Sequence, residues 1–187
     1  MTFSYVSGRR CLDFAGTMKY RTSSRENLLT SPELLSDWAV RAGLLDAAIE
    51  VTGDDLLAAI ELREAIYRTV IARLERRRPE PADVDLLNGY GSQPQLTPRL
   101  DATGTARREG TAAQLLATLA ADLLDLLAGP DIERVKGCEE RDCTRLYVDS
   151  SRAKNRHWCG MSTCGNKAKV RAFRERQRAA AGSAQSV

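Results

Sequence analysis

Four cysteines stand in two evenly spaced pairs near the C-terminus, Cys138 with Cys143 and Cys159 with Cys164. They form the pattern C-x4-C-x15-C-x4-C. Each pair can close a tight loop around one metal ion, and four thiolates suit a tetrahedral zinc ion. Because four cysteines leave no open coordination position, the pattern indicates a structural zinc site rather than a catalytic one.

The residues around the cysteines predict how this metal-binding unit is built. Residues 138–143 form a tight turn, residues 144–148 read as a strand, and residues 156–159 bring the chain back to Cys164 at the start of a final helix. A turn and a helix N-terminus that supply two thiolates each are the arrangement of a treble-clef zinc finger. Because roughly 45 residues contain too little core to fold alone, we expect zinc to contribute most of the folding energy.

Charge is distributed unevenly along the 187 residues, although the formal net charge is only +3. Residues 136–178 hold 12 Lys and Arg against 5 Asp and Glu, whereas the rest of the chain holds 16 against 20. A mildly acidic body with a basic appendage is typical of a small nucleic-acid-binding module attached to another domain. A basic helix that is simply solvated would give the same balance, so the charge alone leaves both interpretations open.

The predicted final helix carries a basic stripe of four residues at spacings of four, three and four. Such a stripe can lie in a groove of DNA or along its phosphates. Val170 and Phe173 form a separate apolar edge that we expect to pack on the finger. The candidate nucleic-acid contacts are this stripe and its basic neighbours: Arg152, Lys154, Arg156, Lys167, Lys169, Arg171, Arg174 and Arg178.

The first 130 residues read as a mainly helical domain with one β-hairpin. Helices are predicted where apolar residues recur at helical spacing behind a capping residue, as after Ser31-Pro32 and after the capping box that starts at Thr111. Gly43 and Gly129 supply helix stops. The predicted elements are a strand or short buried stretch at 10–14, helices at 32–42, 54–77, 81–87 and 112–128, and a β-hairpin at 95–108.

Arg63 falls in the middle of the apolar stripe of the helix predicted at 54–77. Burying a charge alone is costly, so the guanidinium must be paired, with Asp13 or Glu26, or must reach a polar cavity. A structural buried pair, a ligand-contacting arginine and an exposed arginine with a buried stem all remain open. For a ligand cavity between the helices and the hairpin, the candidate lining residues are Asp13, Trp38 and Arg63.

Other classes of protein are disfavoured by the sequence. No apolar run approaches the roughly 18 residues that a membrane span needs, and the N-terminus lacks the pattern of a signal peptide. We therefore expect a cytoplasmic protein, in which clustered cysteines favour metal over disulfides, and in which the remaining Cys11 is a small buried hydrophobe. His157 is the only histidine, and without a partner histidine or a phosphate-binding loop an enzyme is not expected.

The C-terminal part resembles a known zinc finger. Residues 158–170 read Trp-Cys-Gly-Met-Ser-Thr-Cys-Gly-Asn-Lys-Ala-Lys-Val, and they are preceded by Asp-Ser-Ser-Arg at 149–152 and by the upstream cysteine pair. Together these stretches resemble the signature of the CGNR zinc fingers. The arginine that gives that family its name is Lys167 here, which keeps the charge but cannot make the planar bidentate contact of a guanidinium.

The first part of the chain resembles the ABATE domain that precedes this finger in the same family. The matching stretches are Leu12-Asp13-Phe14, the helix at Ser31-Pro32 with Trp38 and Gly43-Leu44, Leu62 to Ala65, and the hairpin from Leu96 to Gly110. Gly16 stands where the family motif Asp-Phe-x-Asn-Thr has asparagine. The resemblance implies a stress-response transcription regulator, in which an α/β sensing or dimerising domain is joined to a DNA-binding finger.

We therefore expect an α+β protein with three parts. These are a mainly helical ABATE-like domain with a β-hairpin at 1–130, a treble-clef CGNR finger at 131–178, and a disordered tail at 179–187. One structural zinc ion is expected on the four paired cysteines, and no membrane contact is expected.

The expected function is that of a transcriptional regulator that binds double-stranded DNA. A small-molecule effector would act on the N-terminal domain. A homodimer is expected because regulators with one small finger per chain gain affinity by pairing. A zinc-stapled protein–protein interaction module and an RNA-binding protein are the alternatives.

Overall fold

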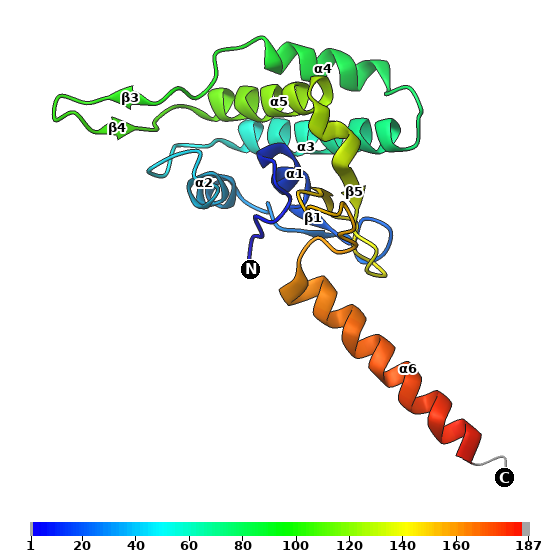
Figure 1. Cartoon of the computed structure of the whole chain (residues 1–187). Coiled ribbons are helices and arrows are strands. Elements are labelled where there is room, and N and C mark those ends of the chain that lie inside the picture. Colours follow the sequence, from blue (N-terminus) through cyan, green and yellow to red (C-terminus); the bar gives the residue numbers. More distant parts are fainter. Residues whose placement is uncertain (1, 185–187) are drawn as a thin grey trace.

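The computed structural model describes residues 2–184, and their side chains as far as Arg178. In the N-terminal part, α4 packs on α3 and α5, and α1 lies against the other side of these two helices, with α2 beside α3 (Figure 1). Their bounds are α1 (Arg10–Ala15), α2 (Pro32–Arg41), α3 (Gly53–Leu74), α4 (Pro81–Gly91) and α5 (Ala112–Ala128).

The short helix α1 lies at the centre of the hydrophobic core. Cys11, Leu12 and Phe14 are fully buried, and the ring of Phe14 packs against that of Trp38 with 5.0 Å between centroids. The burial predicted for this stretch and for Cys11 is confirmed, but the alternative of a strand at 10–14 is wrong. So few residues, apolar on most sides, carry no periodicity that separates a helix from a strand.

The longer helices follow the predicted patterns. Thr111 caps α5 in a complete capping box with Gln114, and the leucines of α5 form one buried face. Helix α4 continues past its predicted end at residue 87 as far as Gly91, which lies close to α5. A Cβ at this position would lie 2.5 Å from Leu124 Cδ1.

Three antiparallel strand pairs complete the fold. They are β1 (Met18–Lys19) with β2 (Glu26–Asn27), β3 (Arg99–Leu100) with β4 (Ala106–Arg107), and β5 (Val135–Gly137) with β6 (Leu146–Val148). The β3–β4 hairpin, predicted at 95–108, projects away from the helices (Figure 1). Its base is held by Asp46, whose carboxylate accepts the N–H of Arg108 at 2.7 Å.

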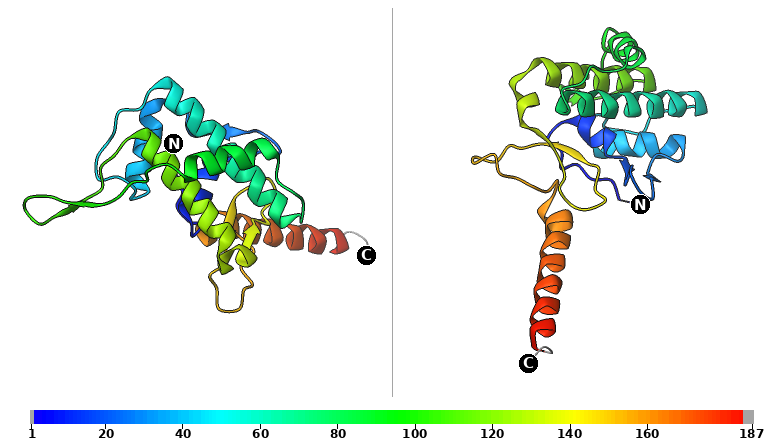
Figure 2. Two further views of the ribbon diagram at one scale, coloured as in Figure 1. Left: turned by 90° about the horizontal axis from the view of Figure 1, so that it is seen from above. Right: turned by 90° about the vertical axis from the view of Figure 1, so that its right-hand side faces the viewer.

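The C-terminal part begins with a 3₁₀ turn at Pro130–Arg134 and the β5–β6 pair, and it ends in a π-helical turn at Met161–Gly165 followed by α6 (Asn166–Ala184). Helix α6 leaves the rest of the molecule as a single rod, which is visible in all three ribbon views (Figures 1 and 2). Residues 179–184 are helical rather than part of a disordered tail, and residues 185–187 lie outside the described residues. The predicted α+β class is confirmed, and none of the described helices has the length and apolar character needed to cross a membrane.

Candidate metal centre and nucleic-acid interface

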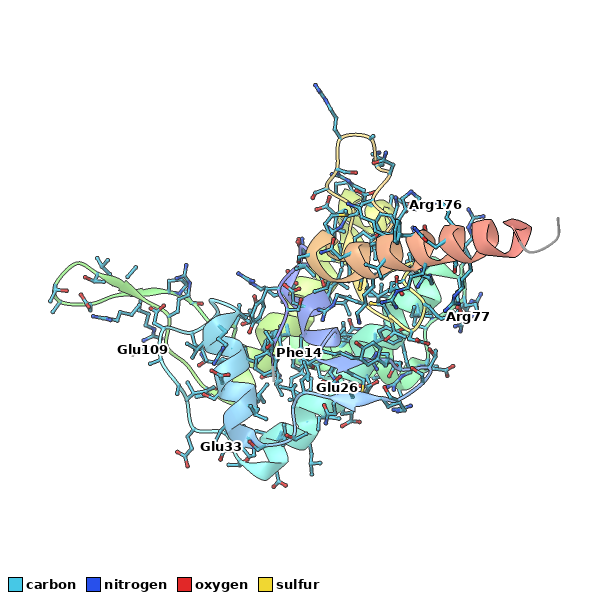
Figure 3. The ribbon with its side chains drawn as sticks, turned by 90° about the horizontal axis from the view of Figure 1, so that it is seen from below. Phe14, Glu26, Glu33, Arg77, Glu109 and Arg176 are labelled. Carbon is cyan, nitrogen blue, oxygen red and sulfur yellow. The ribbon has the colours of Figure 1, made fainter. Side chains whose placement is uncertain are left out.

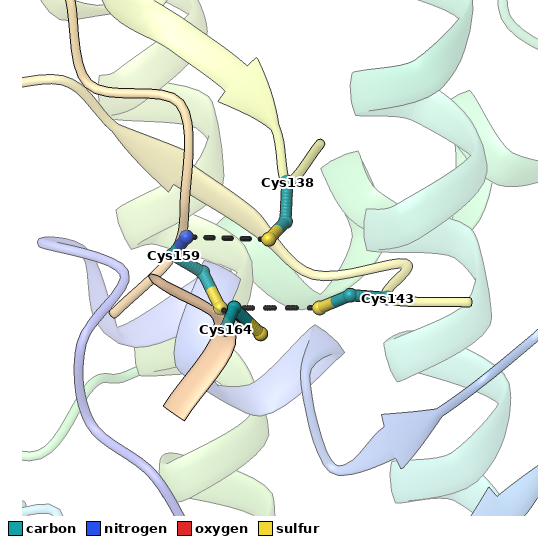
Figure 4. Close-up of side chains that lie close together, drawn as sticks. All are labelled: Cys138, Cys143, Cys159 and Cys164. Atoms are coloured by element: carbon teal, nitrogen blue, oxygen red, sulfur yellow. Dashed lines mark hydrogen bonds between the residues drawn. The ribbon is translucent and has the colours of Figure 1, made fainter. Parts of the chain in front are cut away.

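The four paired cysteines meet at one point, although they are spread over residues 138–164. Their Sγ atoms all lie within 4.8 Å of one another. Cys159 Sγ is 3.9 Å from Cys143 Sγ and 3.5 Å from Cys164 Sγ. A tetrahedral zinc ion with Zn–S bonds of about 2.3 Å separates its sulfurs by roughly 3.8 Å. The cluster therefore has the dimensions and the donor set of a site for one zinc ion (Figure 4).

Crowding of the thiols sets their ionisation. Hydrogen bonds from the thiols of Cys143 and Cys159 lower the pKa of Cys138. The same contact with Cys138 raises the pKa of Cys143. The ionised form of Cys138 is therefore favoured and that of the neighbouring Cys143 is opposed, as expected where negative charges crowd together. A divalent cation removes this opposition, because its charge favours the thiolate form of every ligand.

Two backbone turns present the cysteines to the centre. The first turn closes where the N–H of Cys143 donates to the carbonyl of Glu140 at 2.9 Å. The second closes where the N–H of Gly165 donates to the carbonyl of Gly160 at 3.0 Å, which places Cys164 just before α6. The positive end of the helix dipole favours a thiolate at that position. The N–H of Cys159 also donates to Cys138 Sγ at 3.3 Å (Figure 4).

Asp149 organises the loop that returns the chain to Cys159. Its side chain is fully buried, and one carboxylate oxygen accepts the ammonium of Lys136 at 2.7 Å and the N–H of Arg156 at 3.0 Å. The other oxygen accepts the N–H of Ser151 at 3.0 Å. The ammonium of Lys136 holds the pKa of Asp149 well below its usual range. One buried carboxylate thus fixes both ends of the loop that precedes the second cysteine pair.

The metal-binding unit is joined to the helical part by backbone hydrogen bonds. The N–H of Val148 donates to the carbonyl of Ser7 at 2.8 Å, and the N–H of Arg21 donates to Thr144 Oγ1 at 3.2 Å. Leu146 and Val148 of β6 also belong to the main hydrophobic core. The strand that leads away from the first cysteine pair is therefore part of the helical core.

Two family models match the chain in this order. ABATE, described as a "putative stress-induced transcription regulator", covers residues 8–130, which is more than half of the chain. The chain belongs to the ABATE family. A CGNR zinc finger covers residues 134–177 and contains all four cysteines of the cluster. No curated protein matches the chain.

The basic residues predicted to contact nucleic acid divide into two groups in the CGNR finger. The exposed group lies on α6 and on the loop before Cys159, and comprises Arg152, Lys154, Lys167, Lys169, Arg174 and Arg178. Arg176 is exposed on α6 as well (Figure 3), although it lies off the predicted stripe. These side chains are therefore accessible to a partner.

Arg156 and Arg171 form the second group, because internal partners hold both side chains. The guanidinium of Arg156 donates to the backbone carbonyls of Trp158, at 2.8 Å, and of Val6, at 3.0 Å. Arg171 Nη1 donates to Glu140 Oε1 at 2.5 Å, and this bond raises the pKa of Arg171. Both guanidinium groups therefore connect parts of this chain to one another instead of being available to a partner.

The apolar edge of α6 does not pack on the finger as predicted. Val170 and Phe173 are 49% and 55% exposed. The small core of the finger is filled instead by Tyr147 with the metal-binding cysteines and the half-buried Trp158. Because α6 points away from this core, its apolar edge remains in water.

The structure places the three residues predicted to line a cavity, Asp13, Trp38 and Arg63, in the interior of the protein. All three side chains are buried within the packed core of the ABATE domain. Asp13 accepts the N–H of Ser7 at 2.9 Å, and Trp38 packs against Phe14. These side chains therefore connect elements of the core.

Arg63 is a buried structural arginine, which is one of the three alternatives that the sequence left open. Its partners differ from the predicted ones. Its guanidinium donates to Glu64 Oε1 at 2.9 Å and to Asn27 Oδ1 at 2.7 Å. The predicted partners are wrong, because Asp13 faces the N-terminal segment and Glu26 pairs at the surface with Lys19 at 3.1 Å. Burial lowers the pKa of Arg63, and the neighbouring carboxylate of Glu64 opposes that shift.

Three residues important to the finger were missed from the sequence. Asp149 was named only within the stretch that resembles the CGNR signature, although an aspartate followed by serines is typical of a turn in which the carboxylate accepts the next N–H groups. Glu140 and Arg145 gave no comparable indication, because their partners come from segments far away in the sequence.

Proposed function

We propose that this protein is a transcriptional regulator whose CGNR finger presents α6 to double-stranded DNA. The observation that carries the proposal is the exposure of α6. It projects alone from the zinc centre (Figures 1 and 2), and every described side chain after Ala172 is exposed. Its 19 residues give a length of roughly 28 Å, and the major groove of DNA admits such a helix.

The charges on α6 favour DNA over a flat acidic protein surface. Successive residues of a helix are rotated by about 100°. Arg174 and Arg178 therefore share one side, while Arg176 lies on the opposite side. Phosphates line both walls of a DNA groove and can pair with cations on two sides of a helix at once. The description of the ABATE family as transcription regulators points the same way.

Binding to random-sequence duplex DNA tests the proposal. The zinc-loaded chain is titrated against a labelled duplex, with fluorescence anisotropy as the readout, across a series of salt concentrations. Each phosphate contact contributes about 0.9 to the slope of log affinity against log salt. We expect the double variant Arg174→Ala, Arg178→Ala to bind more weakly, with a slope smaller by about 2.

A matched control lies on the β3–β4 hairpin, where Arg99 and Arg107 are also exposed. The double variant Arg99→Ala, Arg107→Ala removes the same charge far from α6 and should leave the salt slope unchanged. Absence of binding at low salt by a folded, zinc-loaded chain would contradict the proposal and favour a protein partner. Stronger binding to structured RNA than to duplex DNA would favour the RNA-binding alternative.

The remaining parts of the proposal concern assembly and regulation. We propose a cytoplasmic homodimer without catalytic activity, controlled by a small-molecule effector. His157 is exposed, and its Nδ1 lies 2.9 Å from both carboxylate oxygens of Glu139, so it is engaged at the surface rather than beside a nucleophile. Light scattering of the zinc-loaded chain tests the dimer, and a mass of one chain at every concentration would contradict it.

A further inference from the structure

A groove of about 1060 Å³ lies between the ABATE domain and the CGNR finger. The N-terminal part of the chain contributes residues 2–4, 16 and 18–20 to its lining. The finger contributes residues 140–145, 159 and 162–164, which include three of the metal-binding cysteines, and one side of α6. Ligand sites in proteins occur preferentially at such junctions between domains. The groove is therefore a better candidate for an effector site than the filled interior of the ABATE domain.

Arg145 places in this groove a cation that forms no ion pair among the described residues, although its charge favours the ionised form of the buried Asp13 carboxyl. Its half-buried guanidinium contacts only backbone carbonyls, that of Ser4 at 3.2 Å and that of Gly16 at 3.4 Å. Among the described residues, no carboxylate lies within ion-pair distance of it. Both hydrogen bonds are long, and a guanidinium withdrawn from water is stabilised much more strongly by an anion.

Gly16 makes room for this guanidinium. A Cβ at position 16 would lie 2.5 Å from Arg145 Nη1, so any residue other than glycine here would displace the guanidinium. Gly16, which has no side chain, therefore lies next to the guanidinium of Arg145, which has no ion-pair partner. The glycine opens space at the place where the positive charge lies.

The rest of the lining suits an anion that also carries an apolar part. The lining includes seven Lys and Arg against three Asp and Glu, and one of those carboxylates, Glu140, is already paired with Arg171. A zinc ion with four thiolates adds roughly two negative charges, which leaves the groove positive. Met18 and Val170 supply apolar surface from its two sides.

We propose that this groove binds a small organic anion, whose charged group pairs with Arg145 and whose apolar part lies against Met18 and Val170. A guanidinium offers paired N–H donors in the geometry that a carboxylate, sulfonate or phosphate group accepts. Because the ligand touches both the ABATE domain and α6, it is placed to act as the effector, and that regulatory role rests on the proposed function. The binding site itself does not.

The probe for this site is 8-anilinonaphthalene-1-sulfonate, which joins an anionic group to apolar rings and fluoresces when it is shielded from water. Titration into the zinc-loaded full chain should show saturable binding at one site. Arg145→Gln should weaken the binding about tenfold or more, since it removes the charge-assisted bonds. Met18→Asp should weaken it similarly, because it puts a negative charge and a smaller side chain on the opposite side of the groove.

Controls separate the groove from other sites and from loss of folding. The Arg99→Gln variant alters a small concavity on the β3–β4 hairpin and should bind the probe as the parent chain does. Zinc content and the thermal midpoint show whether each variant is folded, and Met18→Asp gives a second test should Arg145→Gln misfold. Non-saturable binding, or unchanged affinity in folded Met18→Asp, overturns the proposal. The titration with the probe contains no nucleic acid, so its result does not depend on whether the chain binds DNA.

Discussion

At the scale of single residues, buried charges connect parts of the chain that are far apart in sequence. Glu64 bridges the guanidinium groups of Arg21 and Arg63, and Arg21 also lies 3.9 Å above the ring of Tyr67. In the finger, Asp149 holds the loop that precedes Cys159. Ion pairs of this kind are costly to break because the remaining group loses its partner in a place that water cannot reach.

The first prediction concerns Arg63. Arg63→Met should destabilise the chain by about 2 kcal/mol, because Glu64 Oε1 and Asn27 Oδ1 each lose a charge-assisted hydrogen bond from the buried guanidinium. Arg73→Met on the same helix removes an arginine whose pair with Glu133 is exposed on both sides, and it should cost about 0.5 kcal/mol or less. Urea unfolding of both variants measures the difference. Equal unfolding midpoints would show that the buried network contributes nothing.

The second prediction concerns Asp149. Asp149→Asn should lower the affinity for zinc about tenfold, because groups that orient metal ligands typically contribute that much. Its pKa is lowered in the folded chain, so its contribution is present at all pH values above the ordinary range near 4 and is lost only as the pH falls through the lowered value.

The difference in zinc affinity between the two proteins should therefore be the same at pH 6 and at pH 8, measured by competition with a chelating dye. Asp131→Asn, which removes a carboxylate from an exposed pair with Arg134, should keep the parent affinity. A difference that varied between these two pH values would contradict the assigned role of the Asp149 carboxylate.

At the scale of elements, helices α5 and α6 are stabilised by different interactions. Most leucines of α5 are buried, and α5 contacts three other helices, whereas the described side chains of α6 beyond Ala172 are all exposed. Isolated helices of this length are marginal in water. The stability of α6 therefore depends on its anchor at the zinc centre and on whatever partner it meets.

The third prediction follows from this contrast. In zinc-loaded protein, the amides of residues 173–178 should exchange with solvent about 100-fold or more faster than those of residues 116–123 in α5. Hydrogen exchange with mass spectrometry measures both segments in one sample. Addition of duplex DNA should slow exchange in α6 alone. Slow exchange in α6 without a partner would show that something else supports the helix.

At the scale of the whole molecule, the ABATE domain and the finger share one core. Strand β6 carries Leu146 and Val148 into the hydrophobic cluster of the helices, and its Val148 bonds to Ser7. The same segment links the two cysteine pairs. Zinc binding therefore stabilises a strand on which part of the ABATE core rests.

The fourth prediction tests this coupling. In the Trp158→Phe variant, the buried Trp38 remains as the only tryptophan and reports on the ABATE core alone. Removal of zinc with a chelator should lower the thermal midpoint that Trp38 reports, and return of zinc should restore it, because an ion that binds only the folded state stabilises it. A midpoint that did not change on chelation would mean that the two parts fold independently.

Local chemistry allowed much of this protein to be predicted from the sequence. The spacing of the four cysteines identified the zinc ligands, since thiolate chemistry and loop length are set by neighbouring residues. Capping residues and apolar periodicity predicted α2, α3 and α5, because those features act within one or two helical turns. The basic stripe of α6 was visible for the same reason.

The tertiary structure alone decided which charged residues face water and which face one another. Arg171 belongs to the basic stripe by spacing, yet Glu140, far away in the sequence, occupies it. Arg63 donates to Asn27, which lies 36 residues away in the sequence, rather than to Asp13. Gly16 leaves room for the guanidinium of Arg145 because the two residues come to lie side by side in the folded chain. Such pairings depend on how whole elements pack, and nothing in the local sequence specifies the partner.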